Sequence, residues 1–491
     1  MQFSIFKMLL LFIIFFSFSQ KAIPFPNDSS RVEPIEISET AMLLSQYLKI
    51  PSVTGEEINA GKFLAEYCAV KGLQMDYFST KKDSYNFAAS LYPLSLGKPN
   101  IVLIHHIDVV SGGNSKLWKN GPFSGKIEDG YIWGRGALDA KGLGIMQLAA
   151  LLEIQKKADS VEYPFNVTLL CVSGEETGGK KGTAIIMKYF LEYLNPVVVF
   201  GEGGSGLEGA VSSDPDQIVY GISVAEKKSL WLKLELQQIT YGHGATPAPE
   251  YANKSMIEAL NRINNRKLRL EFDRSNRIMF RKFGKVEGGI RGFFISNINW
   301  AILAPFVKSY VKKHPLYKAL VTNTITFTNI FSPPGPPNKI SNSASAVLDC
   351  RLLPGTSKKA FLRYLTNLID DPNIKIHVIN ESAGGGFTKP DIFYDQMESA
   401  IKFHDPEAEV VPILFPATTD NSYFRKYDIP TYGLIPAVLS KGLIANIHSV
   451  NEKISLEILE SGVAVYTTFL ENVLKMEMDE KFKNKLEVKF Q

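Results

Sequence analysis

Apolar segments of strand length alternate with segments of helical periodicity through the first half of the chain. Helical spacing of apolar residues extends over residues 40–48 and 60–71, and buried strands are predicted at residues 100–110, 166–172 and 196–200. This alternation predicts an α/β fold with a central sheet flanked by helices. Because open α/β sheets place their sites beyond the carboxyl ends of strands, we expect the functional residues in the loops that follow these segments.

The middle of the chain differs from the two ends. A length of 491 residues is too great for one simple core, so we expect two domains. Residues 221–380 predict short strands and helices of an α+β unit, and the α/β alternation returns afterwards, ending in a helix at residues 456–474. We therefore predict a catalytic domain formed by residues 33–220 and 381–476, with a small α+β domain inserted between its two parts.

The aromatic-rich stretch from Phe293 to Lys313 lies inside this inserted region. It is partly amphipathic, with basic residues near both ends. Packing in a core or between domains is one interpretation. A contact with an acyl chain or a membrane surface is the other.

The N-terminus has the pattern of a signal peptide. An apolar run from Met8 to Phe18 follows Lys7 and is too short to span a membrane, and small residues at 17 and 19 suit cleavage. We predict a signal peptide at residues 1–19 and a secreted, periplasmic or lumenal protein. An uncleaved N-terminal anchor, which would place the protein on a membrane, is the alternative.

The composition excludes several other classes. The chain is 45% hydrophobic and 21% charged with a net charge of +4, which is typical of a folded globular protein. No dense basic block suggests nucleic-acid binding, and no GxGxxG follows a first strand, which argues against a dehydrogenase. Three scattered cysteines predict buried thiols instead of a disulfide framework.

Acidic and imidazole side chains follow several of the predicted strands. His106 and Asp108 lie two residues apart on one strand, so their side chains share a face and the carboxylate can orient the imidazole. Asp139 lies in the glycine-rich turn GRGALDAKG, where a helix cap with ion pairs to Arg135 and Lys141 is the alternative interpretation.

Four further candidates complete a possible active site with metal. Glu175 and Glu176 are adjacent after an apolar strand and would repel each other unless a cation or a shared proton relieved them. Glu202 follows the strand PVVVF, and His448 lies near the C-terminus. His106, Asp139, Glu176, Glu202 and His448 offer nitrogen and oxygen donors that suit two Zn²⁺ ions sharing one carboxylate, which is hydrolytic chemistry.

Six motifs in this order resemble the M20 metallopeptidase and aminoacylase family: HHIDVV, GRGALDAKG, SGEETGGKKG, FGEGG, YGHGATP and NIHSVNEKI. The region from Phe283 to Arg351 resembles the branch with carboxypeptidase S and the N-fatty-acyl-amino-acid synthase/hydrolases. The resemblance implies a zinc-peptidase-type domain with a mixed sheet and a ferredoxin-like α+β lid or dimerisation domain. It also implies a homodimer.

The resemblance further implies a role for each metal-site residue. His106, Asp139 and Glu202 would hold one Zn²⁺, and Asp139, Glu176 and His448 the other, so that each subunit holds two. Glu175 would be the catalytic base, passing a proton from the attacking water to the leaving nitrogen. Asp108 would fix the tautomer of His106.

The resemblance also implies one catalytic and two substrate-binding residues in the inserted domain. His243 would stabilise the oxyanion, often in the site of the dimer partner. Arg351 and Asn338 resemble contacts to the substrate carboxylate and the oxyanion. Ile340 and Ser341 stand where relatives have proline, which is a departure from the family pattern near Asn338.

The expected reaction is hydrolysis of an amide bond beside a free carboxylate, in a small molecule or short peptide. A C-terminal exopeptidase and an N-fatty-acyl-amino-acid hydrolase or synthase are close rivals, since their substrates share this amide. A non-catalytic relative that binds zinc as a scaffold is the alternative from another class.

Overall fold

The computed structural model describes residues 37–79, 84–158, 160–238, 243–384 and 386–476. The predicted signal peptide at residues 1–19 lies outside these ranges. In the described residues, no single helix is long and apolar enough to cross a membrane. Gly289–Ser296 and Ala301–Lys313 reach that length and composition only when taken together, across a bend of 109°.

An eight-stranded sheet forms the centre of the region predicted as the catalytic domain. Its strands lie in the order β1 (Gln74–Ser79), β2 (Asn86–Ser90), β6 (Asn166–Val172), β3 (Asn100–His106), β7 (Pro196–Leu207), β14 (Thr431–Val438), β8 (Val219–Glu226) and β13 (Glu409–Phe415). β3 is parallel to both β6 and β7, whereas β2 is antiparallel to β1 and β6. The predicted mixed central sheet is therefore confirmed.

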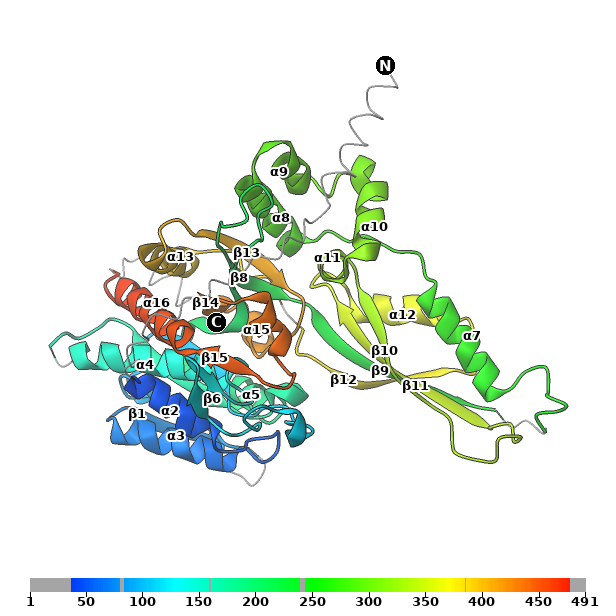
Figure 1. Cartoon of the computed structure of the whole chain (residues 1–491), viewed down its shortest axis with the longest axis horizontal. Helices are drawn as coiled ribbons and strands as arrows, with labels where there is room; N and C mark the ends of the chain where they lie inside the picture. The colour runs from blue at the N-terminus through cyan, green and yellow to red at the C-terminus, as the bar shows by residue number, and fades with distance from the viewer. Residues whose placement is uncertain (1–36, 80–83, 159, 239–242, 385, 477–491) are drawn as a thin grey trace, which may run out of the picture. The chain divides into compact units, whose positions relative to one another are not determined.

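Both faces of this sheet are buried, as its continuous apolar strands require. Along β3, Ile101 and Leu103 join one core while Val102 and Ile104 join another, because successive side chains point to opposite faces. The first core packs against α2 (Glu39–Leu48), α3 (Ile58–Val70), α4 (Lys141–Ala158), α13 (Ile392–His404) and α16 (Leu456–Leu474). The second packs against α5 (Thr183–Tyr189), α6 (Leu191–Leu194) and α14 (Asn421–Arg425). α4 and α16 lie side by side (Figure 1).

A second sheet is antiparallel and has four strands. Its order is β10 (Thr324–Phe331), β11 (Ser343–Leu352), β9 (Lys228–Gln237) and β12 (Lys375–Glu381). Alternate residues of β9 from Leu230 to Leu236 are buried beneath α7 (Ala252–Asn264) and α12 (Lys358–Ile369) (Figure 1). With α7 after β9 and α12 after β11, the chain follows the β-α-β-β-α-β path of a ferredoxin-like unit.

The predicted domain limit at residue 221 falls inside β8, which belongs to the large sheet. The small sheet begins at Lys228, and the division into domains otherwise stays a prediction. A buried ion pair lies at the end of β8, just before the small sheet begins. Oε1 of Glu226 is 2.6 Å from Nη1 of Arg425, and neither side chain is exposed.

Four helices interrupt the small domain between α7 and β10. They are α8 (Arg274–Glu287), α9 (Gly289–Ser296), α10 (Ala304–Lys313) and α11 (Pro315–Val321). Met279, Phe280, Val307 and Val311 pack with residues of β8 and β13 in a core of their own. The interpretation that the stretch from Phe293 to Lys313 packs in a core is therefore confirmed for one of its faces.

A short three-stranded sheet joins the C-terminal part of the chain to an early turn. β15 (Lys453–Ser455) pairs with β5 (Tyr131–Trp133), which pairs with β4 (Lys126–Glu128). The pairing aligns Lys453 with Trp133. The segment that carries His448 therefore lies beside the turn that carries Asp139.

Candidate metal centre and active site

His106 ends β3 and points toward a group of carboxylates. Its Nε2 is 3.0 Å from Oδ1 of Asp139 and 3.7 Å from Oε2 of Glu202, and the side chain is only 2% exposed. Its Nδ1 is 2.8 Å from the backbone carbonyl of Asp108. With Nδ1 directed at this carbonyl, Nε2 is the ring nitrogen that faces the carboxylates.

The Asp139 carboxylate lies between two imidazoles. Its second oxygen, Oδ2, is 2.9 Å from Nε2 of His448, which is in turn 3.3 Å from Oε1 of Glu176. One carboxylate therefore faces both halves of the predicted ligand set. Asp139 therefore contacts both predicted histidine ligands, and its sharing between two ions stays a prediction.

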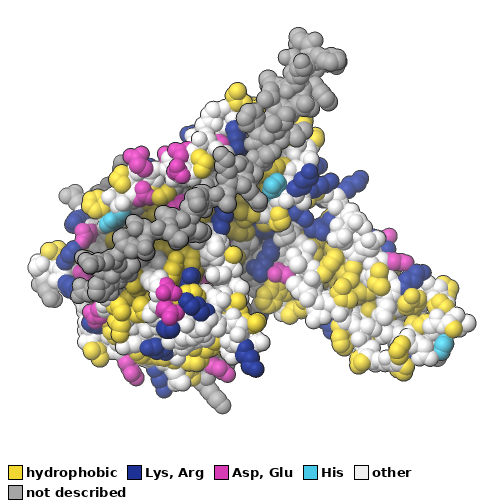
Figure 2. Space-filling model, in the orientation of Figure 1, with side chains coloured by type: hydrophobic (Ala, Val, Ile, Leu, Met, Phe, Trp, Pro, Cys, Tyr) yellow, Lys and Arg dark blue, Asp and Glu magenta, His cyan; other side chains and the backbone are white. Residues whose placement is uncertain are grey.

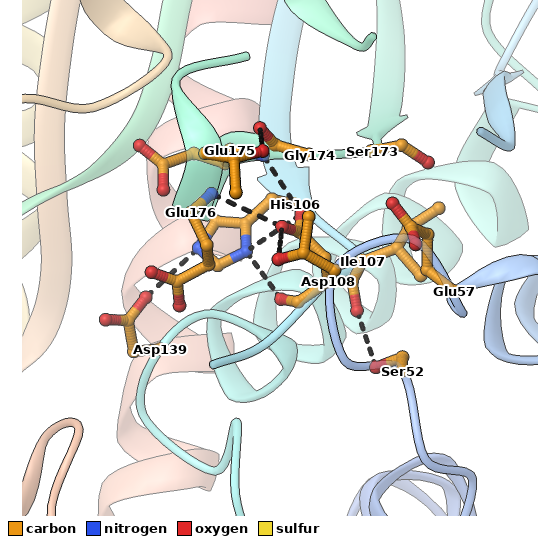
Figure 3. Close-up of polar contacts among 12 residues, drawn as sticks. Ser52, Glu57, His106, Ile107, Asp108, Asp139, Ser173, Gly174, Glu175 and Glu176 are labelled. Atoms are coloured by element: carbon orange, nitrogen blue, oxygen red, sulfur yellow. Dashed lines mark hydrogen bonds and ion pairs between the residues drawn. The ribbon is translucent and has the colours of Figure 1, made fainter. Parts of the chain in front are cut away.

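Asp108 holds the turn that carries Glu175 and Glu176 (Figure 3). Its carboxylate accepts hydrogen bonds from the backbone N–H of Glu175 at 3.1 Å and of Glu176 at 3.3 Å, and from Oγ1 of Thr54 at 2.8 Å. Gly174, with φ of +74°, makes the turn possible after β6. Oδ1 of Asp108 is 3.7 Å from Nδ1 of His106, whereas the backbone carbonyl oxygen of Asp108 is 2.8 Å from the same nitrogen. The carbonyl therefore makes the shorter contact with the imidazole.

Burial and close contact between charged groups shift the pKa values of the carboxylates and of His448 in this cluster. Burial, with the neighbouring Glu202 carboxylate, raises the pKa of Glu175 well above 4.5. Burial, with Asp139 nearby, raises the pKa of Glu202 to about 8. Although burial opposes it, hydrogen bonds from His106 and His448 hold the pKa of Asp139 below its ordinary value. Hydrogen bonding to Asp139 and Glu176 raises the pKa of His448 to about 10.

The donor atoms of these residues fit a metal site. Donor atoms of His106, Glu175 and Glu202 lie within 4.8 Å of one another, as do those of His106, Asp139 and Glu176. The Glu176 Oε1 is buried without a hydrogen bond, although His448 lies close. Buried carboxylates that repel one another and offer unshared oxygens need positive charge, and mixed nitrogen and oxygen donors suit zinc.

Glu452 fixes the turn before Asp139, a role that the sequence did not reveal. Its Oε2 is 2.6 Å from Nη1 of Arg135, and its Oε1 accepts hydrogen bonds from the N–H groups of Gly136, Leu138 and Asp139 at 3.0–3.3 Å. Arg135 therefore pairs with Glu452 and not with Asp139. The only signal was the position of Glu452 in NIHSVNEKI, beside His448.

The loop before α14 supports Glu202. Nδ2 of Asn421 donates a hydrogen bond to the backbone carbonyl of Glu202 at 2.7 Å. Thr419 donates both its N–H and its hydroxyl to Glu226, each at 2.8 Å. The buried Glu226–Arg425 pair thus anchors the loop that holds this ligand strand in place.

The three predicted substrate residues lie in the small domain. Nε2 of His243 is 2.8 Å from Nδ2 of Asn338, so the structure brings these two residues together. Arg351 forms a bidentate pair with Asp349, at 2.9 and 3.1 Å. In the described part of the chain, none of the three forms a hydrogen bond or ion pair with the metal-site residues.

The small sheet separates these residues along its length. Arg351 pairs with Ser229 at the end of the sheet next to the catalytic domain, where Asn380 also contacts the carbonyl of Thr177. His243 and Asn338 lie at the opposite end, where β9 ends. Ten residues of β9 span roughly 30 Å at about 3.3 Å per residue.

Comparison with known proteins identifies the class. Residues 102–472 match the model of peptidase family M20/M25/M40, so the chain belongs to this family. A metallo-carboxypeptidase of the M20 family from Sulfolobus solfataricus has the same fold, with a TM-score of 0.67 at 20% identity over 89% of this chain and 100% of that one. The chain is thus an enzyme of the M20 metallopeptidase and amidohydrolase class, as the sequence predicts.

Among individual relatives, the chain is 27% identical to the probable carboxypeptidase S-like 2 of Dictyostelium discoideum over 76% of this chain and 72% of that protein. It is 24% identical to the N-fatty-acyl-amino acid synthase/hydrolase PM20D1 of Homo sapiens over 92% of this chain and 91% of that protein. These relatives represent the two kinds of protein in the one branch that the sequence resembles.

Glu452→Gln is expected to destabilise the fold, because it leaves the buried Arg135 guanidinium without its counter-charge. The expected loss is about 3–5 kcal/mol of unfolding free energy, measured by urea denaturation. Glu457→Gln, at an exposed position on α16, is the control and should cost less than about 1 kcal/mol. Equal losses in the two variants would contradict the role given to Glu452.

Proposed function

We propose that the protein is a two-zinc amidohydrolase that cleaves an amide bond beside a free carboxylate. The observation that carries this proposal is the Asp139 carboxylate between His106 and His448, with Glu175 beside the same cluster. In the proposed site His106, Asp139 and Glu202 hold one ion, and Asp139, Glu176 and His448 hold the other. Bound Zn²⁺ would polarise the amide carbonyl and lower the pKa of water.

Glu175 is the proposed general base. It takes a proton from the attacking water and returns it to the leaving nitrogen, so the C–N bond breaks as a carboxylic acid and an amine form. Burial and the neighbouring Glu202 carboxylate raise the pKa of Glu175. Bound cations would lower this pKa toward a value at which Glu175 can both accept the proton from water and give it to the nitrogen. Asp108 positions this residue by accepting the backbone N–H of Glu175.

The substrate side of the proposal rests on the small domain and the relatives. A guanidinium such as that of Arg351 binds a planar carboxylate with two hydrogen bonds, and Arg351 already holds the Asp349 carboxylate in this way. The relatives are named for carboxypeptidases and for N-fatty-acyl-amino-acid hydrolysis and synthesis. Both substrate classes contain an amide beside a free carboxylate, and synthesis is the same step reversed.

A homodimer would give His243 and Asn338 a role. These residues meet at the end of the small sheet away from their own catalytic domain. In the proposed dimer they reach the site of the other subunit, where the His243 imidazole stabilises the oxyanion. We also propose export through the N-terminal segment, with membrane attachment if that segment is retained.

The proposal can be tested by measuring the release of free amino acid from two substrate sets, N-oleoyl-amino acids and blocked dipeptides. The assay compares zinc-loaded protein with a control treated with a chelator. Chelator-sensitive cleavage of the oleoyl set alone would assign the enzyme to acylated amino acids. Preference for the dipeptides would assign it to the carboxypeptidases. No cleavage of either set would contradict the proposed function.

Glu175→Gln should retain zinc and lose at least about a hundredfold in kcat, because it removes the base but keeps the size of the side chain. His448→Ala should lose about one zinc per chain, because it removes a ligand of one ion. Elemental analysis and steady-state kinetics measure the two effects. A Glu175→Gln enzyme with full kcat would show that another residue is the base.

Mixing two inactive variants tests the shared site. Glu175→Gln and His243→Ala should each be inactive alone, yet a mixture allowed to exchange subunits should regain about a quarter of the wild-type activity, since half the dimers contain one intact site. Each variant mixed with itself is the control. Absence of recovery, with mixed dimers demonstrated, would rule out a site built from two subunits.

A further inference from the structure

The helices from α8 to α11 carry an unusual concentration of positive charge. Residues 274–321 contain ten lysines and arginines and one acidic residue, Glu287, in a chain whose total net charge is +4. Glu287 is buried and lies 3.1 Å from Nε of Arg291. The exposed charge of this region is therefore entirely positive.

The same helices present apolar side chains to solvent. One face packs into the core with β8 and β13, and that packing already accounts for residues such as Val307 and Val311. On the other side Ile290 is 79% exposed, Phe293 52%, Trp300 45% and Ile302 76%. Single exposed apolar residues are common on soluble proteins, but four within thirteen consecutive residues, including two aromatic rings, form a local group.

The group is structurally ordered. Ile290 and Phe293 are three residues apart on α9 and so share one side of the helix. The rings of Phe293 and Trp300 are in edge-to-face contact, with centroids 5.6 Å apart. Lys308, Lys312 and Lys313 are exposed on the next helix, α10, and Figure 2 shows basic side chains gathered beside that helix.

We propose that this surface, which we call the α9–α10 surface, binds the face of an anionic lipid bilayer. Aromatic and aliphatic side chains can enter the boundary between headgroups and acyl chains, while adjacent lysines contact anionic headgroups. α9 and the segment from Ala301 to Lys313 meet at a bend of 109°, so the two helical segments do not form one straight rod. This inference does not depend on the substrate of the enzyme.

The charge pattern favours a bilayer over a second copy of the chain. A symmetric dimer through this surface would bring two equally basic regions together, and like charges in contact are unfavourable. A nucleic acid would satisfy the lysines, but it would leave Ile290 and Ile302 without an apolar partner.

A probe at position 302 tests whether this surface enters lipid. Ile302→Cys, labelled with a solvent-sensitive fluorophore, reports the position of the α9–α10 surface, and Phe403→Cys on α13, where the side chain is 73% exposed, is the control. The three native cysteines are buried, which favours selective labelling. We expect a blue shift and quenching by acyl-brominated lipids at position 302 alone, with phosphatidylserine-containing vesicles.

A second experiment tests the contribution of the lysines to vesicle binding. The triple change Lys308→Gln, Lys312→Gln and Lys313→Gln should weaken binding to these vesicles by roughly fivefold for each lysine removed. Lys62→Gln, Lys116→Gln and Lys180→Gln, at exposed sites elsewhere, make the same change in net charge and should have little effect.

Three outcomes would overturn the proposal. One is vesicle binding that leaves the probe at position 302 unquenched, since the chain would then attach through another segment. The others are equal quenching at position 403, and a probe response that follows protein concentration or added nucleic acid without lipid.

Discussion

The shared position of Asp139 between His106 and His448 is the contact on which the catalytic architecture depends. Each imidazole is within 3.0 Å of a different oxygen of this carboxylate. Glu175, Glu176 and Glu202 surround the same point, so the site concentrates negative charge that would otherwise oppose folding. The scaffold must hold these groups together against their repulsion, and cations bound at the proposed site would convert that repulsion into affinity.

Three buried polar residues hold these groups in place, and each one supports the backbone of a different proposed ligand. Asp108 holds the Glu175–Glu176 turn, Glu452 holds the turn of Asp139, and Asn421 holds the strand of Glu202. In all three cases the anchor bonds to backbone groups of the ligand segment, which leaves the ligand side chains free for chemistry. Removing an anchor would therefore misplace a ligand without changing the donor set.

Sequence patterns predicted the elements with strong periodicity and missed those without it. The strand at 166–172 and the helix at 456–474 have the bounds that were predicted. Helix α4 was not predicted, because it is buried on most sides and begins with Gly142 and Gly144, so neither amphipathic spacing nor helix propensity marks it. His106, Glu176 and Glu202 could be named because they end or follow apolar strands, whereas Asp139 and His448 were recognisable from the motifs around them. The role of Glu452 could not, because it depends on the pairing of β15 with β5, which joins distant parts of the chain.

The order of the ligands along the chain sets a limit on how the enzyme matures. His106 is made early and His448 near the end, with the whole small domain between them. During synthesis, a nascent chain can offer His106, Asp139, Glu176 and Glu202 long before the last imidazole has left the ribosome. In the proposed site, full coordination would wait until the C-terminal segment docks through β15, so metal loading would be coupled to the final stage of folding. A truncated product that lacks this segment would have most of the ligands but could not close the site.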